Sequence, residues 1–585
     1  FLFCCCYDMG ELLVPKATGK GSASEKRRKS GGTGLNDLFI AVFGVGFVIS
    51  LSLNVLHLTG KLDSEHSHNT ALHQAVQEFK YAPSRHRSDE TPNDVITLGT
   101  LNCDSYGGPP AEQSQEMVYW HEIPSDAKWT SPFKNPTDTR YLTFEPDGGG
   151  WNNIRMAMES TLGLALAMGR TLVMPPEKKM YLLGKDHKQQ KSHFSFIDFY
   201  PIEEIASEHI GLDIISMKEY LETEAMTGKL KNKFTGLVEF PPGNRTDWDG
   251  IDQHDYDILR EYLRNVTYTP LWKPGDCLPA FPASGDHRDV AFLQDLVEKA
   301  KVPSGKPVDV DNPDPLPRLE ETLANRKKLC VYDEEMQAAK ALHFQCNHKL
   351  KLRLLVHFYG FLFFEDWKDD LFMKRFIRDH VRYIDQIQCA AARVVAAVRA
   401  HARKRDPLGN PDGIFDSFHI RRGDFQFKTT RIPAEEIFEN SKDELSPNTT
   451  IFIATDERNK SFFDPLRKHY DLLFLDDFPD LLEGVNTNYF GMVDQLIASR
   501  GRIFFGCWFS TFTGYITRLR GYHSQKDKTP GYKEGALPSS YYYATIDKKY
   551  ELHKFAPLRG GFFNREYPTS WRDIDKGIGM LRSTR

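Results

Sequence analysis

Short apolar runs alternate with amphipathic segments along the C-terminal part of the chain. The runs that predict buried strands cover residues 414–420, 450–454, 471–475 and 502–505. Segments with helical periodicity cover residues 462–469 and 491–500, and a further helix is expected to begin at Ser510. Strands that alternate with helices at this spacing indicate a parallel, doubly wound sheet.

An earlier block of the chain has a similar order of elements. A strand is expected near Tyr141, and the glycine-rich loop of residues 144–153 leads into a helix that ends near Met168. A second strand covers residues 170–175. A loop, a helix and a strand in this order are typical of nucleotide-binding halves. The sequence therefore predicts an α/β protein with two Rossmann-like domains that face a cleft, an architecture suited to nucleotide sugars.

Composition divides the chain further. Residues 59–137 are polar and mixed, as in a stem, and residues 275–328 are rich in proline, aspartate and glycine, which predicts an insertion or a long surface connection. Residues 371–405 are predicted to form one long helix. We predict five regions: a cytoplasmic tail (1–37), a transmembrane anchor (38–58), the stem (59–137), an N-terminal Rossmann-like domain with an insertion near 275–328 (138–370), and a C-terminal Rossmann-like domain that carries the C-terminal extension (371–585).

The predicted anchor is an uncharged apolar run of 21 positions. At about 1.5 Å per residue, a helix of this length crosses the hydrocarbon core of a bilayer, which is about 30 Å thick. Only Lys61 follows the run closely, whereas six basic residues precede it: Lys16, Lys20, Lys26, Arg27, Arg28 and Lys29. This asymmetry predicts a single-pass type II protein with a lumenal catalytic part. A cleaved signal peptide is the alternative, but the run is longer and farther from the N-terminus than is typical.

Glycosylation patterns and cysteines agree with a location in the Golgi or the endoplasmic reticulum. Four acceptor patterns for N-glycosylation follow the apolar run, at Asn244, Asn265, Asn448 and Asn459. Six of the nine cysteines also follow it, an even number that permits up to three disulfides. The net charge of −5 gives no overall basic field, which disfavours a nucleic-acid partner.

A polar cluster ends the first strand of the C-terminal block. His419, Arg421, Arg422 and Asp424 lie where open α/β sheets bind their ligands. The planar guanidinium group fits phosphate oxygens better than an ammonium group does, which predicts a phosphate site. One alternative is a surface turn in which the arginines pair with nearby acids. Another is an exposed Arg-Gly-Asp adhesion loop, which the flanking apolar strand disfavours.

Further segments belong to the same predicted sheet edge. Ser510 and Thr511 precede a helix, and its free N–H groups favour an anion, although simple capping of the helix is the alternative. Asp456 at a strand end and Asp494 on a helix offer carboxylates to the two adjacent N–H donors of a guanine, or are ordinary solvated charges. The glycines of residues 148–153 allow a ligand to approach the backbone closely.

Metal binding is not expected. Three acidic pairs have the oxygen ligands that a hard divalent cation prefers: Asp247 and Asp249, Asp309 and Asp311, and Asp476 and Asp477. Their flanking residues are typical of turns or of an acidic surface. Arginine can supply the positive charge that a leaving diphosphate needs, so we predict neither a metal nor another bound cofactor.

These motifs resemble the GDP-fucose protein O-fucosyltransferase family. The resemblance rests on residues 419–425, 454–456 and 494–513 and, less specifically, on the loop of residues 148–153. It implies a two-domain GT-B fold, GDP-fucose as the donor, no required metal, and inverting transfer to a hydroxyl. It implies further that the N-terminal domain is on the acceptor side and that the C-terminal domain binds the nucleotide sugar. It also implies that Arg421 neutralises the leaving phosphate and that ten residues bind the nucleotide sugar: Asn152, Asn153, His419, Arg422, Asp424, Asp456, Asp494, Ser510, Thr511 and Phe512.

One position departs from the family's pattern. Some members carry a glutamate three residues before the loop asparagine, and this glutamate activates the acceptor hydroxyl. The corresponding residue here is Gly149, or Gly150 if Asn153 is the matching asparagine. The nearby acidic residues are out of register: Glu145 and Asp147. We therefore assign no catalytic base.

Together these features predict a membrane-anchored glycosyltransferase of the secretory pathway that moves fucose from GDP-fucose to a hydroxyl of a protein or glycan. Its expected partners are the donor, the acceptor and the membrane. The same fold acting on another nucleotide sugar or a polysaccharide is the nearest alternative. A catalytically inactive lumenal binding or scaffold protein is another, which the missing glutamate favours and the presence of Arg421 disfavours.

Overall fold

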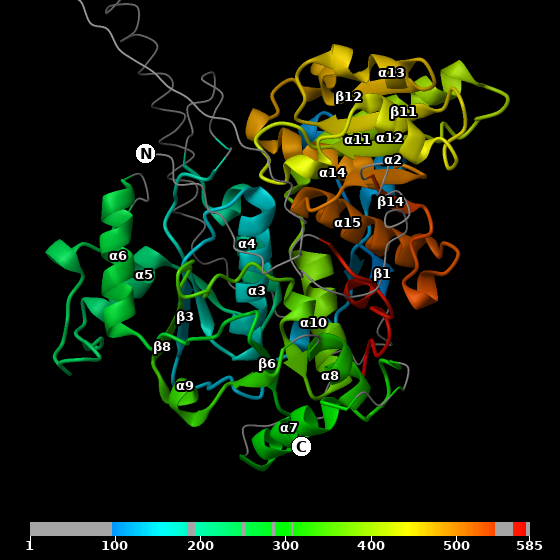
Figure 1. Ribbon diagram of the computed structural model, residues 1–585. Coiled ribbons are helices and arrows are strands. Elements are labelled where there is room, and N and C mark those ends of the chain that lie inside the picture. The colour runs from blue at the N-terminus through cyan, green and yellow to red at the C-terminus, as the bar shows by residue number, and fades with distance from the viewer. Residues whose placement is uncertain are drawn as a thin grey trace, which may run out of the picture. The chain divides into compact units, whose positions relative to one another are not determined.

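The structure is a computed structural model. It describes residues 96–181, 183, 193–248, 252–283, 287–302, 305, 308–323, 326–543 and 565–580. The chain from Pro92 onward is one compact unit, built mainly on three parallel sheets (Figure 1). None of the helices in the described part combines the length and the apolar character that a membrane crossing requires. The predicted anchor at residues 38–58 lies outside the described residues and stays a prediction.

A four-stranded parallel sheet forms the first α/β block, in the order β5–β4–β3–β8. Its strands are β3 (Tyr141–Phe144), β4 (Thr171–Met174), β5 (Ile214–Ser216) and β8 (Ala341–Phe344). All four residues of β3 and of β8 are buried, as the long apolar runs of parallel sheets require. The helices of this block are α3 (Trp151–Ala167), α4 (Ile202–Glu208), α5 (Met217–Tyr220), α6 (Gln253–Val266) and α9 (Glu334–Ala338).

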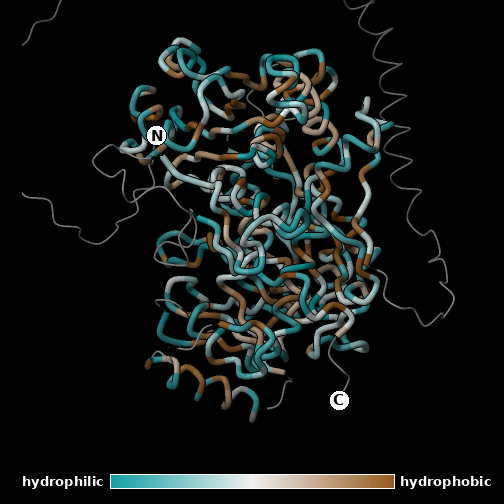
Figure 2. Tube along the Cα trace, turned by 90° about the vertical axis from the view of Figure 1, so that its right-hand side faces the viewer, coloured by the Kyte–Doolittle hydropathy of each residue, from teal (hydrophilic) through white to brown (hydrophobic). Residues whose placement is uncertain are grey.

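The predicted insertion contains regular structure of its own. Strands β6 (Cys277–Phe281), β7 (Lys328–Val331) and β9 (Phe363–Phe364) form a three-stranded parallel sheet in the order β7–β6–β9. Helices α7 (His287–Ala300) and α8 (Leu316–Leu323) pack on it around a separate apolar cluster. Apolar and polar residues alternate around α7, at the lower edge of the molecule (Figure 2). The alternative of a long surface connection was therefore wrong. The proline, aspartate and glycine residues around α7 and α8 concealed the amphipathic pattern of these helices.

The C-terminal block confirms the predicted doubly wound sheet. Its five parallel strands follow the order β12–β11–β10–β13–β14: β10 (Asp416–Ile420), β11 (Thr450–Thr455), β12 (Asp471–Phe474), β13 (Phe504–Cys507) and β14 (Ser540–Tyr543). The helices are α12 (Ala434–Ser441), α13 (Asp464–Arg467), α14 (Phe490–Ser499) and α15 (Thr511–Asp527). The helix expected over residues 462–469 shortens to α13, which follows a 3-10 turn at Lys460–Phe463.

Two helices replace the long helix that was predicted over residues 371–405. Helix α10 (Trp367–His380) and helix α11 (Asp385–Arg405) are separated by residues 381–384. Tyr383 in this break is fully buried and its hydroxyl donates to Gln495. Tertiary contacts of the break thus override a continuous helical pattern.

Part of the segment that the sequence assigns to a stem is packed into the core. Leu101, Met117, Tyr119 and Trp120 are almost completely buried. Short strands β1 (Thr97–Leu98) and β2 (His121–Glu122) pair antiparallel, and helix α2 (Ala111–Ser114) lies between them in the sequence. Their aromatic and apolar side chains explain the burial, which the surrounding polar composition concealed.

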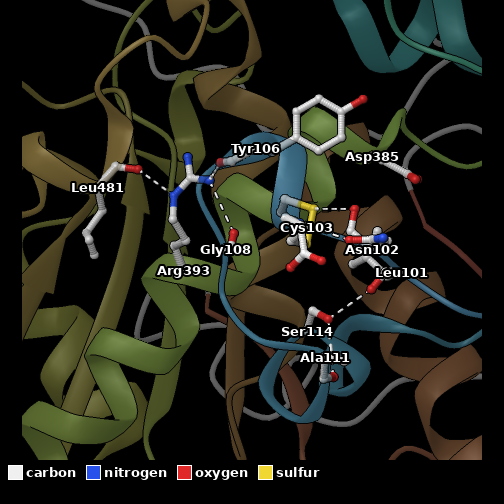
Figure 3. The surroundings of a disulfide bond; sticks show 12 residues. Leu101, Asn102, Cys103, Tyr106, Gly108, Ala111, Ser114, Asp385, Arg393 and Leu481 are labelled. Carbon is white, nitrogen blue, oxygen red and sulfur yellow. Dashed lines mark hydrogen bonds between the residues drawn. A yellow bond between two sulfur atoms is a disulfide. The ribbon is translucent and has the colours of Figure 1, made fainter.

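A disulfide fixes this segment to α11. Cys103 and Cys389 are bonded across 286 residues of sequence (Figure 3). Beside them, Arg393 of α11 donates to the carbonyl oxygens of Leu481 and Gly108. A second disulfide joins two strands of the small sheet, Cys277 of β6 and Cys330 of β7. Two free cysteines remain in the described part of the chain: Cys346 and Cys507.

Candidate functional site

The carboxyl ends of β10 and β13 form the topological switch point of the five-stranded sheet. These strands are neighbours, although the chain passes through β11 and β12 between them. Such a switch point is the place where open α/β sheets bind their ligands. Residues 419–424 end one strand, and Ser510 and Thr511 follow the other. The structure therefore brings the main predicted segments to one edge.

Arg421 is held in place but remains accessible. Its Nη1 lies 2.6 Å from Oδ2 of Asp456, and its Nη2 donates to the backbone oxygen of Asp424 at 2.9 Å. The backbone N–H of Arg421 donates to the hydroxyl of Tyr543, a buried residue of β14. With 21% of its side chain exposed, the guanidinium is oriented by the protein and can still reach a ligand.

Asp456 organises the loop that carries Arg421. Its Oδ1 accepts the backbone N–H of Arg422 at 2.7 Å, and its Oδ2 accepts that of Gly423 at 2.8 Å. A Cβ at Gly423 would lie 2.3 Å from this carboxylate, so only glycine fits here. Both oxygens of Asp456 are engaged within the loop. The predicted contact between Asp456 and guanosine stays a prediction.

Arg422 and Asp424 also make contacts within the fold. Arg422 pairs with Glu457 at 3.0 Å, and its guanidinium lies over the ring of Phe462. The carboxylate of Asp424 accepts a hydrogen bond from the hydroxyl of Tyr181, which belongs to the first block. The alternative that the arginines pair with acids thus holds for Arg421 and Arg422 alike. The Arg-Gly-Asp tripeptide does not project as a free adhesion loop.

His419 is buried and faces the start of α15. Its Nδ1 lies 2.6 Å from Oγ1 of Thr513, and its ring stacks on Phe512 with centroids 4.4 Å apart. Burial, with a smaller contribution from nearby Arg421, lowers the pKa of His419 to about 3. The imidazole is therefore neutral near pH 7, and it adds no positive charge to a phosphate site.

Hydrogen bonds join the glycine-rich loop to the start of α15. Oδ1 of Asn153 accepts from Oγ1 of Thr511 at 3.1 Å, and Oδ1 of Asn152 accepts from Nε2 of Gln495 at 3.0 Å. Gln495 is fully buried and also donates to the backbone oxygen of Phe512. These bonds bring the N-terminal ends of α3 and α15 together, and both ends carry the partial positive charge that favours an anion.

Sequence reasoning missed the residues that hold these two helix ends. Oε1 of Gln495 accepts the hydroxyl of Tyr383 at 2.9 Å, and that hydroxyl accepts the indole N–H of Trp151 at 3.1 Å. A glutamine inside an apolar helix was the available signal, since a buried polar side chain requires partners. Ser510 occupies the N-cap of α15 without making a capping bond to the described residues.

Asp494 is half-buried, and one oxygen of its carboxyl group is unsatisfied. Its Oδ1 is inaccessible to solvent and has no hydrogen-bond partner among the described residues. Burial raises the pKa of Asp494 well above its usual range, and the negative charge of Asp476 adds to the shift. A buried carboxyl oxygen without a partner destabilises the folded protein, which makes this position a candidate for a ligand with N–H donors.

The family model of the GDP-fucose protein O-fucosyltransferases matches residues 141–523. The chain belongs to this family. The match covers strands β3 to β13 and every candidate site residue, and it confirms the family resemblance of the motifs. No curated protein matches the chain significantly.

Several solved fucosyltransferase structures share low similarity with this O-fucosyltransferase family member. POFUT1 in complex with GDP is 14% identical, covers 70% of this chain and 99% of that chain, and gives a TM-score of 0.31. An Arabidopsis thaliana FUT1 mutant in complex with GDP is 11% identical, covers 79% and 82%, and gives 0.32. Fucosyltransferase NodZ from Bradyrhizobium is 13% identical, covers 66% and 94%, and gives 0.28. The assignment rests on the family model, because these values are low.

The acidic residues of the glycine-rich loop are already engaged in this family member. Burial raises the pKa of Glu145, but the hydrogen bond to His343 and the nearby guanidinium groups outweigh burial and lower it to about 2. Asp147 is buried and pairs with Arg353. A Cβ at Gly149 would lie 2.4 Å from Nδ2 of Asn153. The loop therefore has no room for a glutamate at Gly149 without rearrangement.

A buried ion network lies beneath the site and fixes α3 against α15. Oε1 of Glu159 lies 2.5 Å from Nη1 of Arg155, and Oε2 lies 2.8 Å from Nη2 of Arg518. Glu566 completes the network, with Oε1 3.3 Å from Nε of Arg518. All four side chains are at most 2% exposed. Such a network specifies one arrangement of the helices that carry the site.

The described residues contain no group of three histidine, cysteine or acidic side chains placed to hold a metal ion. Among the predicted acidic pairs, Asp309 and Asp311 lie near the ammonium group of Lys576, and Asp476 lies 2.7 Å from that of Lys460. Asp249 lies outside the described residues. The independence of the reaction from metal stays a prediction.

Proposed function

We propose that the protein transfers fucose from GDP-fucose to a hydroxyl group of a protein or glycan acceptor, with inversion and without a metal. The observation that carries this proposal is the oriented, accessible guanidinium of Arg421 at the switch point of a chain that belongs to the O-fucosyltransferase family. We further propose that the catalytic part lies in the lumen of the Golgi or the endoplasmic reticulum, behind a single type II anchor.

Arg421 would act on the leaving group. As the sugar–phosphate bond breaks, negative charge grows on the terminal phosphate of GDP. A guanidinium that Asp456 already holds in position stabilises this charge without having to reorganise. Loss of one such preorganised donor reduces the rate in other enzymes by a factor of about 100 to 1,000. The adjoining ends of α3 and α15 would add N–H donors for the diphosphate.

Asp494 would recognise the guanine base. The N1–H and the exocyclic amine of guanine are two adjacent donors, and the ionised carboxyl group offers two acceptors at a matching spacing. These donors would favour the ionised form and so oppose the rise in the pKa of Asp494 that burial causes. In the free protein Oδ1 of Asp494 has no partner among the described residues, so binding of the base removes a cost that folding imposed. A uracil or an adenine presents no such donor pair, which favours a guanine nucleotide over UDP or ADP.

Activation of the acceptor would not require a carboxylate of the glycine-rich loop. Glu145 and Asp147 are engaged in ion pairs, and the loop has no glutamate at the family position. If the sugar–phosphate bond breaks well before attack, the acceptor oxygen can bond to C1 of the fucose while it still holds its proton, which then passes to the leaving diphosphate or to water. The charge stabilisation by Arg421 then carries most of the catalysis.

The turnover of sugar nucleotides by the full-length protein tests the proposal. We expect release of GDP from GDP-fucose, much slower turnover of GDP-mannose and UDP-sugars, and no effect of a chelator. Arg421→Ala should reduce kcat by about 100-fold or more, whereas Arg403→Ala, an exposed position on α11, should leave it unchanged. Absence of GDP binding contradicts the donor assignment. Tight GDP binding without turnover, with acceptors present, favours an inactive binding protein.

The nucleotide preference of Asp494→Asn tests the guanine contact separately. An asparagine offers one acceptor and one donor, so it opposes guanine but matches xanthine, which has a carbonyl oxygen in place of the exocyclic amine. We expect GDP affinity to fall by about 10- to 100-fold and XDP affinity to rise, as for loss of a hydrogen bond to a charged group. Equal loss of affinity for both nucleotides contradicts the contact.

A further inference from the structure

Three phenylalanine side chains stand partly exposed between the loops that follow β10 and β13. Phe425 and Phe427 belong to the first loop, and Phe509 belongs to the second. The rings of Phe427 and Phe509 stack with centroids 4.7 Å apart and planes at 24°. Phe427 meets Phe425 edge-on at 5.3 Å. We call these three residues the aromatic wall.

The aromatic wall contributes little to the core. Phe425 only borders one apolar cluster, and Phe427 and Phe509 belong to none of the four clusters of the described residues. Phe509 also has a φ of 65°, in the left-handed region that bulky L-residues adopt at a steric cost. Packing within the protein does not account for a strained residue whose ring is partly in water. A surface of this kind is typical of a ligand site.

The position of the aromatic wall identifies the part of the ligand that it meets. The ring centroid of Phe425 lies 5.7 Å from Cζ of Arg421, and Phe509 directly precedes Ser510 and Thr511. In the proposed reaction the donor sugar is bonded to the phosphate that Arg421 neutralises. The sugar must therefore lie next to that guanidinium, and the aromatic wall adjoins the same place.

We propose that the aromatic wall receives the C6 methyl group of the donor sugar and so selects a 6-deoxy sugar over its 6-hydroxy counterpart. The inference rests on the proposed function and names the residues that choose its sugar. A methyl group gains by leaving water for the phenyl rings. A hydroxymethyl group in the same place loses its hydrogen bonds to water and finds no polar partner on the rings.

The expected selectivity is moderate. Apolar pockets reject an added hydroxyl by no more than about 100-fold, so we expect the wild-type protein to prefer the 6-deoxy sugar by about 10- to 100-fold. GDP-L-fucose and GDP-L-galactose form the matched pair for this measurement, because they differ only by the hydroxyl on C6. GDP itself lacks the sugar and serves as the reference for binding.

The test compares kcat/KM for GDP-L-fucose and GDP-L-galactose in the full-length protein and its variants. Phe427→Ala should reduce the preference for fucose about tenfold, and Phe427→Leu, which keeps an apolar surface, should retain most of it. GDP affinity should stay within about twofold of the wild type in both, since Phe427 is assigned to the sugar and not to the nucleotide. Phe292→Ala, an exposed phenylalanine on α7, is the control and should change nothing.

The outcomes separate this inference from the proposed function. A wild-type protein that binds no GDP or uses neither sugar nucleotide overturns both. A normal GDP affinity in Phe427→Ala together with an unchanged sugar preference overturns the aromatic wall alone. If Phe427→Ala does not fold, saturation-transfer NMR on the wild type decides. The C6 methyl protons of GDP-L-fucose should then receive more saturation than the other sugar protons, and weaker saturation of the methyl contradicts the inference.

Discussion

Replacement of Asp456 by asparagine distinguishes two roles for this residue. In the structure its carboxylate accepts the backbone N–H groups of Arg422 and Gly423 and pairs with Arg421. An asparagine has a single acceptor oxygen, and its amide N–H₂ group must face a donor whichever way it turns. If the oxygen is directed to Gly423 and Arg421, the amide N–H₂ group faces the backbone N–H of Arg422, so that two donors meet. In the wild-type protein the backbone nitrogen of Arg422 lies 2.7 Å from Oδ1 of Asp456.

The size of the effect follows from these contacts. One hydrogen bond to a charged acceptor is lost, and the pair with Arg421 becomes an uncharged contact. Hydrogen bonds to charged groups contribute about 1.5–3 kcal/mol each. A loss of about 2–3 kcal/mol in the placement of Arg421 corresponds to a decrease in kcat of roughly 30- to 150-fold. The backbone of the rest of the domain should be unaffected, because β10 keeps its pairing with β11 and with β13.

Steady-state kinetics with GDP-fucose, together with the affinities for GDP and ADP, measure both consequences. If Asp456 positions Arg421, kcat falls and the preference for GDP over ADP is unchanged. If Asp456 contacts guanosine instead, that preference falls and kcat at saturation changes little. Glu457→Gln is the matched control, since Glu457 pairs with the partly exposed Arg422 and accepts the backbone N–H of Asn459 but forms no ion pair with Arg421 in the described part of the chain, and it should change kcat less than about threefold. Equal losses in both variants would refute the reasoning.

Three further predictions concern stability. Glu159→Gln should lower the free energy of unfolding by about 3–5 kcal/mol in denaturant titrations, because it leaves buried guanidinium groups without their charged partner. The control Asp464→Asn, at an exposed ion pair, should change the free energy of unfolding by less than about 0.5 kcal/mol. Replacing Cys103 and Cys389 by serine should cost about 2–5 kcal/mol, and an unchanged Tm under oxidising conditions contradicts it. The pKa of His419 is about 6.5 in the unfolded protein and about 3 in the folded protein, so only the unfolded protein binds this proton between the two values. The free energy of unfolding should therefore fall as the pH decreases from about 6.5 to about 3. His419→Gln should flatten this dependence by up to about 1.4 kcal/mol per pH unit.

The C-terminal sheet was predictable because each of its signals is local. Strands β11 and β12 are short apolar runs bounded by polar residues, and a parallel strand buried on both faces has this pattern. The break between α10 and α11 was not predictable in the same way. Tyr383 and its neighbours fit a helical pattern, and the break depends on partners far away in the sequence, among them Gln495 and Phe199.

The candidate site shows the same division between local and distant causes. Arg421, Ser510 and Thr511 were recognisable because polar residues at the carboxyl ends of apolar strands have few structural reasons to be there. Sequence alone could not show that Arg421 pairs with Asp456 whereas its neighbour Arg422 pairs with Glu457. The two neighbouring arginines pair with different carboxylates, and both of these carboxylates follow another strand, β11.

The residues that hold the site together are hidden from the sequence for a physical reason. Gln495 is the example, since its amide reaches Asn152, Phe512 and Tyr383 from three separate elements. A buried amide is tolerated only when its donors and its acceptor are all satisfied, so each partner constrains the others. The ends of α3 and α15 therefore adopt one relative position, and they keep it before any nucleotide arrives. If Arg421 acts as proposed, the two helix ends that this buried amide holds would spend no binding energy on ordering themselves when the nucleotide binds.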